Sequence, residues 1–181
     1  MQRIIYPLLL SVFLAIVLLP SCGIFVPSDD YKRGEKTTVG KSNNSTTDFS
    51  TMPLRKGIVD DALNLSGVRY KYGGVDPKNG MDCSGLLNYV FQNAGITLRR
   101  SSREQVKDGF QIKKKDVKPG DLIFFARSGK VFHVALITDY DGDKMYVVHS
   151  TSSKGVIRQE ILNNSYWTPK IHSYRDVITR K

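Results

Sequence analysis

The chain of 181 residues contains only two cysteines, Cys22 and Cys83, and they stand in different settings. Two cysteines are too few for a disulfide framework, and Cys22 ends an apolar run, so we expect neither to be bridged. The three histidines, His133, His149 and His172, are scattered, and none lies at the close spacing from a cysteine that structural zinc sites use. The sequence therefore predicts no metal site and no cofactor.

Acidic residues are also scarce. The chain has 17 Asp and Glu against 27 Lys and Arg, which gives a formal net charge of +10. Such an excess favours an anionic partner, which could be nucleic acid, a membrane surface or an acidic polymer such as a cell wall. Charge alone does not choose among these partners. No internal repeat is visible, and the length suits one domain with extensions.

The N-terminus carries a short hydrophobic run, residues 4–19, that is followed closely by a small residue and Cys22. The run is short for a membrane-spanning helix and has the layout of a secretory signal. It resembles a bacterial lipoprotein signal, in which residues 1–21 are removed and Cys22 is lipidated; a plain membrane anchor is the alternative. The polar residues that follow bury too little apolar surface to fold, so residues 22–52 are expected to be a lipidated cysteine and a disordered tether.

Two helices are expected in the first half of the folded part. Apolar residues recur at helical spacing over residues 54–65. A short aromatic strand, residues 68–72, then leads into a glycine-rich loop that lacks the Gly-Lys-Ser/Thr ending of a phosphate-binding loop. A second helix follows Asp82, a suitable N-cap, which places Cys83 in the first turn.

Strand patterns dominate the second half. The expected strands cover residues 121–125, 131–138, 144–149, 156–161 and 171–178. Helices first and an antiparallel set of strands afterwards predict an α+β fold. The basic stretches at residues 99–105 and 113–115 are typical of solvated surface.

Cys83 and two strand histidines could form a catalytic group. The helix N-terminus favours the thiolate form of Cys83, although a small buried hydrophobic residue is the simpler interpretation of a free cysteine. A hairpin makes the strands of His133 and His149 neighbours, and a lone strand histidine is more often a core residue than a catalyst. If the three residues meet in space, Cys83 would be the nucleophile, His133 the general base and His149 the residue that orients His133. The Cys83 backbone N–H, with the Tyr70 O–H as a candidate second donor, would stabilise the oxyanion during amide hydrolysis through a thioester.

Six segments, in order, resemble the signature segments of the NlpC-type cell-wall peptidases, papain-like cysteine hydrolases of bacterial peptidoglycan. These segments are Tyr70–Gly74, Gly80–Leu86, Ser101–Gln105, Pro119–Phe125, His133–Leu136 and His149–Ser150. The resemblance implies a papain-like domain over residues 53–181, with the catalytic cysteine at a helix start packed on an antiparallel sheet. It also implies a triad of Cys83, His133 and His149, with Tyr70 beside the oxyanion.

The family resemblance implies hydrolysis of stem-peptide or cross-link bonds that involve D-amino acids, often next to diaminopimelate. The chain is most similar to the compact Spr-type murein endopeptidases, so the expected partner is peptidoglycan and not nucleic acid. We expect a monomer in the cell envelope, lipid-anchored through Cys22 on the outer membrane facing the periplasm or on the cell surface. The expected substrate contacts are Asp82, Ser84, Arg100, Ser101 and Ser102. A non-catalytic wall-binding lipoprotein and a thiol-dependent lipid or acyl hydrolase are the alternatives.

Overall fold

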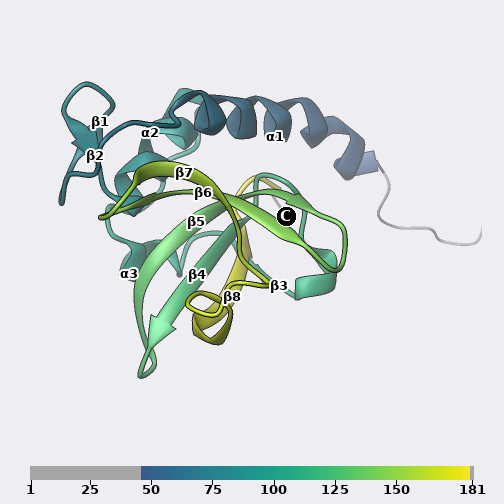
Figure 1. Ribbon diagram of the computed structural model, residues 1–181. Coiled ribbons are helices and arrows are strands. Elements are labelled where there is room, and N and C mark those ends of the chain that lie inside the picture. Colours follow the sequence, from purple (N-terminus) through teal and green to yellow (C-terminus); the bar gives the residue numbers. More distant parts are fainter. Residues whose placement is uncertain (1–45, 180–181) are drawn as a thin grey trace, which may run out of the picture. The chain divides into compact units, whose positions relative to one another are not determined.

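The computed structural model describes residues 46–179 (Figure 1). The expected signal segment 1–21, the lipidation site Cys22 and the expected tether up to residue 45 lie outside the described residues. Within residues 46–179, no helix is both long enough and apolar enough to cross a membrane.

Six strands form one antiparallel sheet in the order β3-β8-β4-β5-β6-β7. They are β3 (Phe110–Ile112), β4 (Leu122–Arg127), β5 (Lys130–Tyr140), β6 (Met145–Thr151), β7 (Gly155–Glu160) and β8 (Ile171–Asp176). The five expected strands are confirmed as β4 to β8. The edge strand β3 was not expected, because it is short and pairs only with β8, which follows more than 60 residues later in the sequence.

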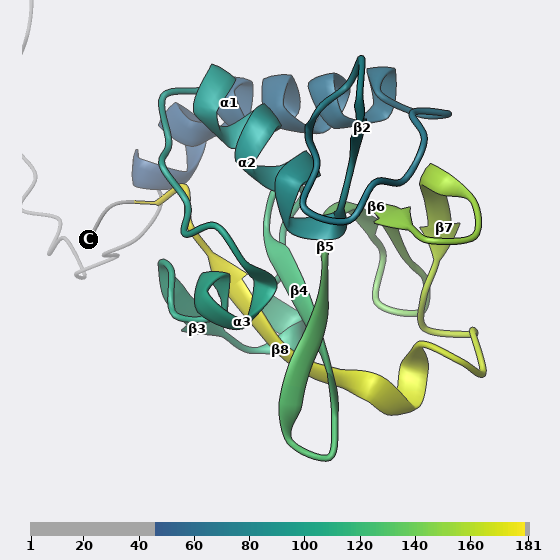
Figure 2. The same ribbon diagram turned by 90° about the vertical axis from the view of Figure 1, so that its left-hand side faces the viewer.

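Two longer helices lie together on one side of the sheet, as Figures 1 and 2 show from two directions. They are α1 (Thr46–Asn64) and α2 (Cys83–Asn93); short helices follow at α3 (Ser102–Gln105), η1 (Lys114–Asp116) and η2 (Thr168–Lys170). The sheet with its helices confirms the α+β fold.

Apolar side chains cover both faces of the sheet because strand residues alternate in direction. On β4, Leu122 and Phe124 join the cluster under α1 and α2, whereas Ile123 and Phe125 join a second cluster on the opposite face. The second cluster includes Trp167, which precedes η2. The sheet is therefore the middle layer of the domain, and the loop that carries Trp167 covers its far face.

Helix α1 begins earlier than expected, at Thr46, so residues 46–52 are helical and do not belong to a disordered tether. Extending a helix whose later turns are packed costs less than starting a new one. The packed turns are held by Arg55, which is 5% exposed. Its guanidinium forms ion pairs with Asp121 at 2.7 Å, before β4, and with Asp176 at 2.9 Å, at the end of β8.

The expected strand over residues 68–72 is wrong. The backbone hydrogen bonds of this segment go to two different elements: Val68 pairs with Val156 of β7, and residues 69 and 71 pair with Met81. Divided in this way, the segment makes only an isolated bridge between Tyr70 and Met81. A small hairpin, β1 (Val75–Asp76) with β2 (Gly80–Met81), lies within the glycine-rich loop.

Candidate functional site

Asp82 caps helix α2 and fixes Cys83 in its first turn, as expected. One carboxylate oxygen of Asp82 accepts from the Gly85 N–H at 2.6 Å, and the other accepts from the Gly73 N–H at 2.9 Å. A Cβ atom on Gly85 would lie 1.9 Å from the carbonyl oxygen of Gly74. The loop therefore packs directly on the first turn of α2, which leaves little freedom for the position of Cys83.

The structure brings His133 of β5 and His149 of β6 together, with His133 Nε2 3.0 Å from His149 Nδ1. His149 Nε2 is in turn 3.0 Å from Oε1 of Gln159 on β7. An amide oxygen only accepts, so His149 Nε2 carries the proton and its Nδ1 accepts from His133. His133 Nδ1 then keeps a free lone pair, which is the form that a general base requires.

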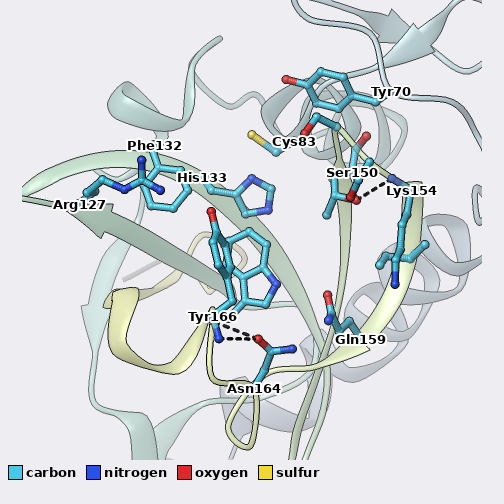
Figure 3. Close-up of a pocket in the computed structure, with 15 residues that line it drawn as sticks. Tyr70, Cys83, Arg127, Phe132, His133, Ser150, Lys154, Gln159, Asn164 and Tyr166 are labelled. Carbon is cyan, nitrogen blue, oxygen red and sulfur yellow. Dashed lines mark hydrogen bonds between the residues drawn. The ribbon is translucent and has the colours of Figure 1, made fainter.

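Cys83, His133 and Tyr70 line one cavity of about 510 Å³, and Figure 3 shows the Cys83 side chain between the other two. Burial raises the pKa of Tyr70, so its O–H remains protonated and available as a donor. These three residues and His149 were singled out from the sequence, and all four lie in or directly behind this cavity.

Trp167 covers the histidine pair. Its ring stacks on His133 with centroids 4.7 Å apart and an interplanar angle of 28°, and it lies 5.1 Å from the ring of His149. Burial lowers the pKa of His133 well below its ordinary value, with a smaller contribution from His149. Burial likewise lowers the pKa of His149 to about 4. Both imidazoles are therefore neutral at pH 7.

The charge state expected for Cys83 is wrong. The helix N-terminus was expected to favour the thiolate, but burial raises the pKa of Cys83 to about 11. Removal from water disfavours the charged form more than the helix terminus favours it. The resting site thus holds a neutral thiol beside a neutral imidazole, and the proton can move to His133 as the sulfur attacks.

The five expected substrate contacts gather in a second pocket, of about 420 Å³, that also reaches Cys83. Within it, Arg100 Nη2 forms an ion pair with Asp82 at 3.0 Å, and Arg100 Nη1 donates to the Ser84 hydroxyl at 3.1 Å. Ser101 caps α3, and Ser102 is buried. The stretch 99–105 is therefore not merely solvated surface, because its residues 100–103 line this pocket.

Sequence reasoning missed Gln159 and Trp167. Gln159 pairs with Val147, two residues before His149, and a predicted register of the β6–β7 hairpin would have placed it diagonally across from His149. Trp167 is the only tryptophan in the chain, but nothing in its local sequence points to His133. Among residues 46–179, no three His, Cys, Asp or Glu side chains gather in a way that could hold a metal ion.

Comparisons with known proteins agree with the fold. A sequence model described as the NlpC/P60 family matches residues 67–176. The chain is 48% identical over 115 residues to Gamma-DL-glutamyl hydrolase of Bacillus subtilis, an alignment that covers 61% of this chain and 27% of that protein. It is 33% identical over 128 residues to Murein DD-endopeptidase MepS/Murein LD-carboxypeptidase of Escherichia coli, covering 70% and 65% respectively.

Two solved structures show the same architecture. An NlpC/P60 family protein from Bacillus cereus aligns with a TM-score of 0.61 and 27% identity, over 68% of this chain and 40% of that one. A Staphylococcus aureus protein described as similar to lipoprotein, NLP/P60 family, aligns with a TM-score of 0.61 and 32% identity, over 71% of this chain and 43% of that one.

Proposed function

Because the chain belongs to the NlpC/P60 family, we propose that it is a cysteine peptidase that cleaves amide bonds in peptidoglycan stem peptides or cross-links. The observation that carries the proposal is the hydrogen-bonded series Gln159, His149 and His133, which leaves the free lone pair of His133 in the cavity of Cys83. The names of the relatives support the substrate class, since one is a murein endopeptidase and another a gamma-DL-glutamyl hydrolase.

In the proposed reaction the Cys83 sulfur attacks the carbonyl carbon of the substrate amide while His133 Nδ1 takes the thiol proton. The carbonyl oxygen becomes an oxyanion, which the Cys83 backbone N–H and the Tyr70 O–H stabilise. The carbon–nitrogen bond breaks, His133 gives its proton to the leaving amine, and a thioester remains on Cys83. Water then attacks the thioester as His133 removes its proton, and the returning proton restores the thiol.

His149 holds His133 in this reactive orientation by accepting from its Nε2–H. A neutral base suits the buried site, since no separated charges have to exist before the substrate arrives. The pocket around Asp82, Ser84 and Arg100, with Ser101 and Ser102, would hold the part of the stem peptide that lies on its side of Cys83. The bond that is cleaved would involve a D-amino acid or diaminopimelate.

The proposal extends to the location of the enzyme. A lipid on Cys22 would anchor a monomeric domain in the cell envelope, where peptidoglycan is the anionic polymer within reach and nucleic acid is not. The expected signal sequence supports this placement, and so does the Escherichia coli relative, which is named as a murein endopeptidase.

The test uses purified sacculi and mass spectrometry of the released peptides. We expect the wild-type protein to release new muropeptides and Cys83→Ala to reduce the rate by at least about 10³-fold, because the nucleophile is lost. Cys22→Ser, which changes the other cysteine of the chain, should leave the rate in solution unchanged. The masses of the products identify the bond that is cut.

Three outcomes would overturn the proposal. Release that is undiminished in Cys83→Ala would exclude Cys83 as the nucleophile. Sedimentation of the wild-type protein with sacculi but without any products would indicate a wall-binding lipoprotein. Products from lipid substrates alone would indicate a lipid or acyl hydrolase.

A further inference from the structure

The cavity that contains Cys83 and His133 has a basic lining. Arg127 and Lys154 both line it, and Figure 3 shows them on opposite sides of His133. The remaining lining residues are hydroxyl, amide, aromatic and aliphatic side chains, and no Asp or Glu is among the described residues of the lining. This differs from the second pocket, where Asp82 already pairs with Arg100.

The position of Lys154 is fixed by the backbone of the β6–β7 turn. Its N–H donates to the Thr151 hydroxyl at 3.2 Å, which closes the turn. The next residue, Gly155, has a φ of +67°, and a Cβ there would lie 2.3 Å from the carbonyl oxygen of Val68. Val156 N–H also donates to that same carbonyl, at 2.9 Å. The turn is thus packed against the segment before Tyr70, which fixes the backbone of Lys154 at one side of the cavity that its side chain lines.

Arg127 is held at the other side by an aromatic ring. The tight turn after β4 is made by Ser128 and Gly129, with φ of 47° and 73°. It folds the chain back so that the Arg127 guanidinium lies 5.4 Å from the centroid of the Phe132 ring, which itself lines the cavity. The ring face attracts the guanidinium but accepts no proton from it, so Arg127 keeps its positive charge and its N–H donors. Within residues 46–179, neither Arg127 nor Lys154 forms an ion pair with an acidic side chain of the chain itself.

We propose that this cavity is a binding site for an acidic peptide segment, with one free carboxylate at Lys154 and a second at Arg127. The inference rests on the proposed function and specifies that the part of the substrate on this side of Cys83 is negatively charged. Peptidoglycan stem peptides carry free carboxylates, and an amidated stem of the same shape would leave both cations without a partner. The site would therefore discriminate between acidic and amidated stems mainly through binding.

The experiment measures kcat and KM of the full chain on two soluble muropeptides, one with free stem carboxylates and one with the same carboxylates amidated. We expect the wild-type protein to have a KM for the acidic peptide roughly threefold to tenfold lower than for the amidated one, the range that partly exposed ion pairs supply. Lys154→Gln and Arg127→Gln should each raise KM for the acidic peptide severalfold, with kcat little changed. Both variants should change KM for the amidated peptide much less than KM for the acidic one, and Lys154→Arg, which keeps the positive charge, should restore most of the preference for the acidic peptide.

Lys144→Gln is the matched control, because Lys144 is an exposed lysine in the turn between β5 and β6 and is not part of the cavity lining. If Lys144→Gln and Lys154→Gln changed KM for the acidic peptide equally, the effect would come from the general charge of the protein, and the inference would be overturned. Equal KM values of the wild-type protein for both peptides would also overturn it while leaving the proposed function intact. If neither peptide nor sacculi are cleaved, the proposed function fails, and calorimetric binding of the two peptides to Cys83→Ala still decides whether the cavity selects carboxylates.

Discussion

Gln159 accepts from His149 through its amide oxygen, and that oxygen has no proton to give. The direction of both hydrogen bonds follows from this one acceptor, since each imidazole has a single proton to place. His133 consequently presents a bare nitrogen to the cavity. Gln159 thus decides which nitrogen of His133 can act as a base, although its strand partner on β6 is Val147 and not a histidine.

Replacing Gln159 should therefore affect the rate through the histidine tautomers. We expect Gln159→Leu to lower kcat about tenfold, because one buried hydrogen bond that orients the histidines is lost, and to leave KM nearly unchanged. Gln159→Glu keeps an acceptor and adds a negative charge, which raises the pKa of His149, so the acid limb of the kcat profile should move to higher pH. Gln111→Leu, on the exposed edge strand β3, is the control. A Gln159→Leu enzyme with wild-type kcat at every pH would show that the tautomers are fixed in another way.

The neutral thiol of Cys83 predicts a specific pH dependence of its alkylation. With a pKa of about 11, the thiolate fraction should rise about tenfold per pH unit, and so should the rate with iodoacetamide, from about pH 6 to about pH 9. The measurement uses a Cys22→Ser background so that Cys83 is the reacting thiol. A rate that is already constant across this range would indicate a thiolate–imidazolium pair in the resting enzyme instead.

At the scale of elements, the first turn of α2 is positioned by contact between two backbones. The carbonyl oxygen of Gly74 lies where a side chain on Gly85 would begin, and the Asp82 carboxylate ties the same loop to the helix. The nucleophile therefore stands on a helix start that is locked to the loop before it.

Gly85→Ala tests this contact. Its Cβ would stand 1.9 Å from the Gly74 oxygen, so the loop or the helix must shift, and we expect a loss of about 1–3 kcal/mol in the free energy of unfolding together with a large loss of kcat. Gly57→Ala in α1 is the control, because no atom lies within 4 Å of its added Cβ and it should gain about 0.5–1 kcal/mol. Urea unfolding and sacculus assays check both. An unchanged kcat in Gly85→Ala would mean that the position of Cys83 does not depend on this contact.

For the whole molecule, the features that the sequence predicts are the local ones. Helix α2, its cap and the strands β4 to β8 follow from patterns within each segment. The neighbouring histidines follow from a hairpin between consecutive strands. The pairing of β8 with β4 and of β3 with β8 joins distant segments, and no local pattern contains that information.

The same distinction explains the errors at the site. A helix terminus is visible in the sequence, so it suggested a thiolate for Cys83, whereas the burial that raises the pKa of Cys83 comes from the packed domain. Gln159 and Trp167 became part of the site only through strand register and through the loop that covers the far face of the sheet. Arg55 looked like an ordinary residue of a core-facing helix, yet its guanidinium joins α1 to Asp121, just before β4, and to Asp176, at the end of β8.

The placement of Trp167 also gives the molecule a spectroscopic property. Since the chain has no other tryptophan, all of its indole fluorescence arises from a ring stacked on His133. Indole emission responds to the polarity around the ring and is quenched by a protonated imidazole in contact with it. The protein thus carries its own optical probe of the site, which can follow protonation of His133 and the arrival of a substrate without any added label.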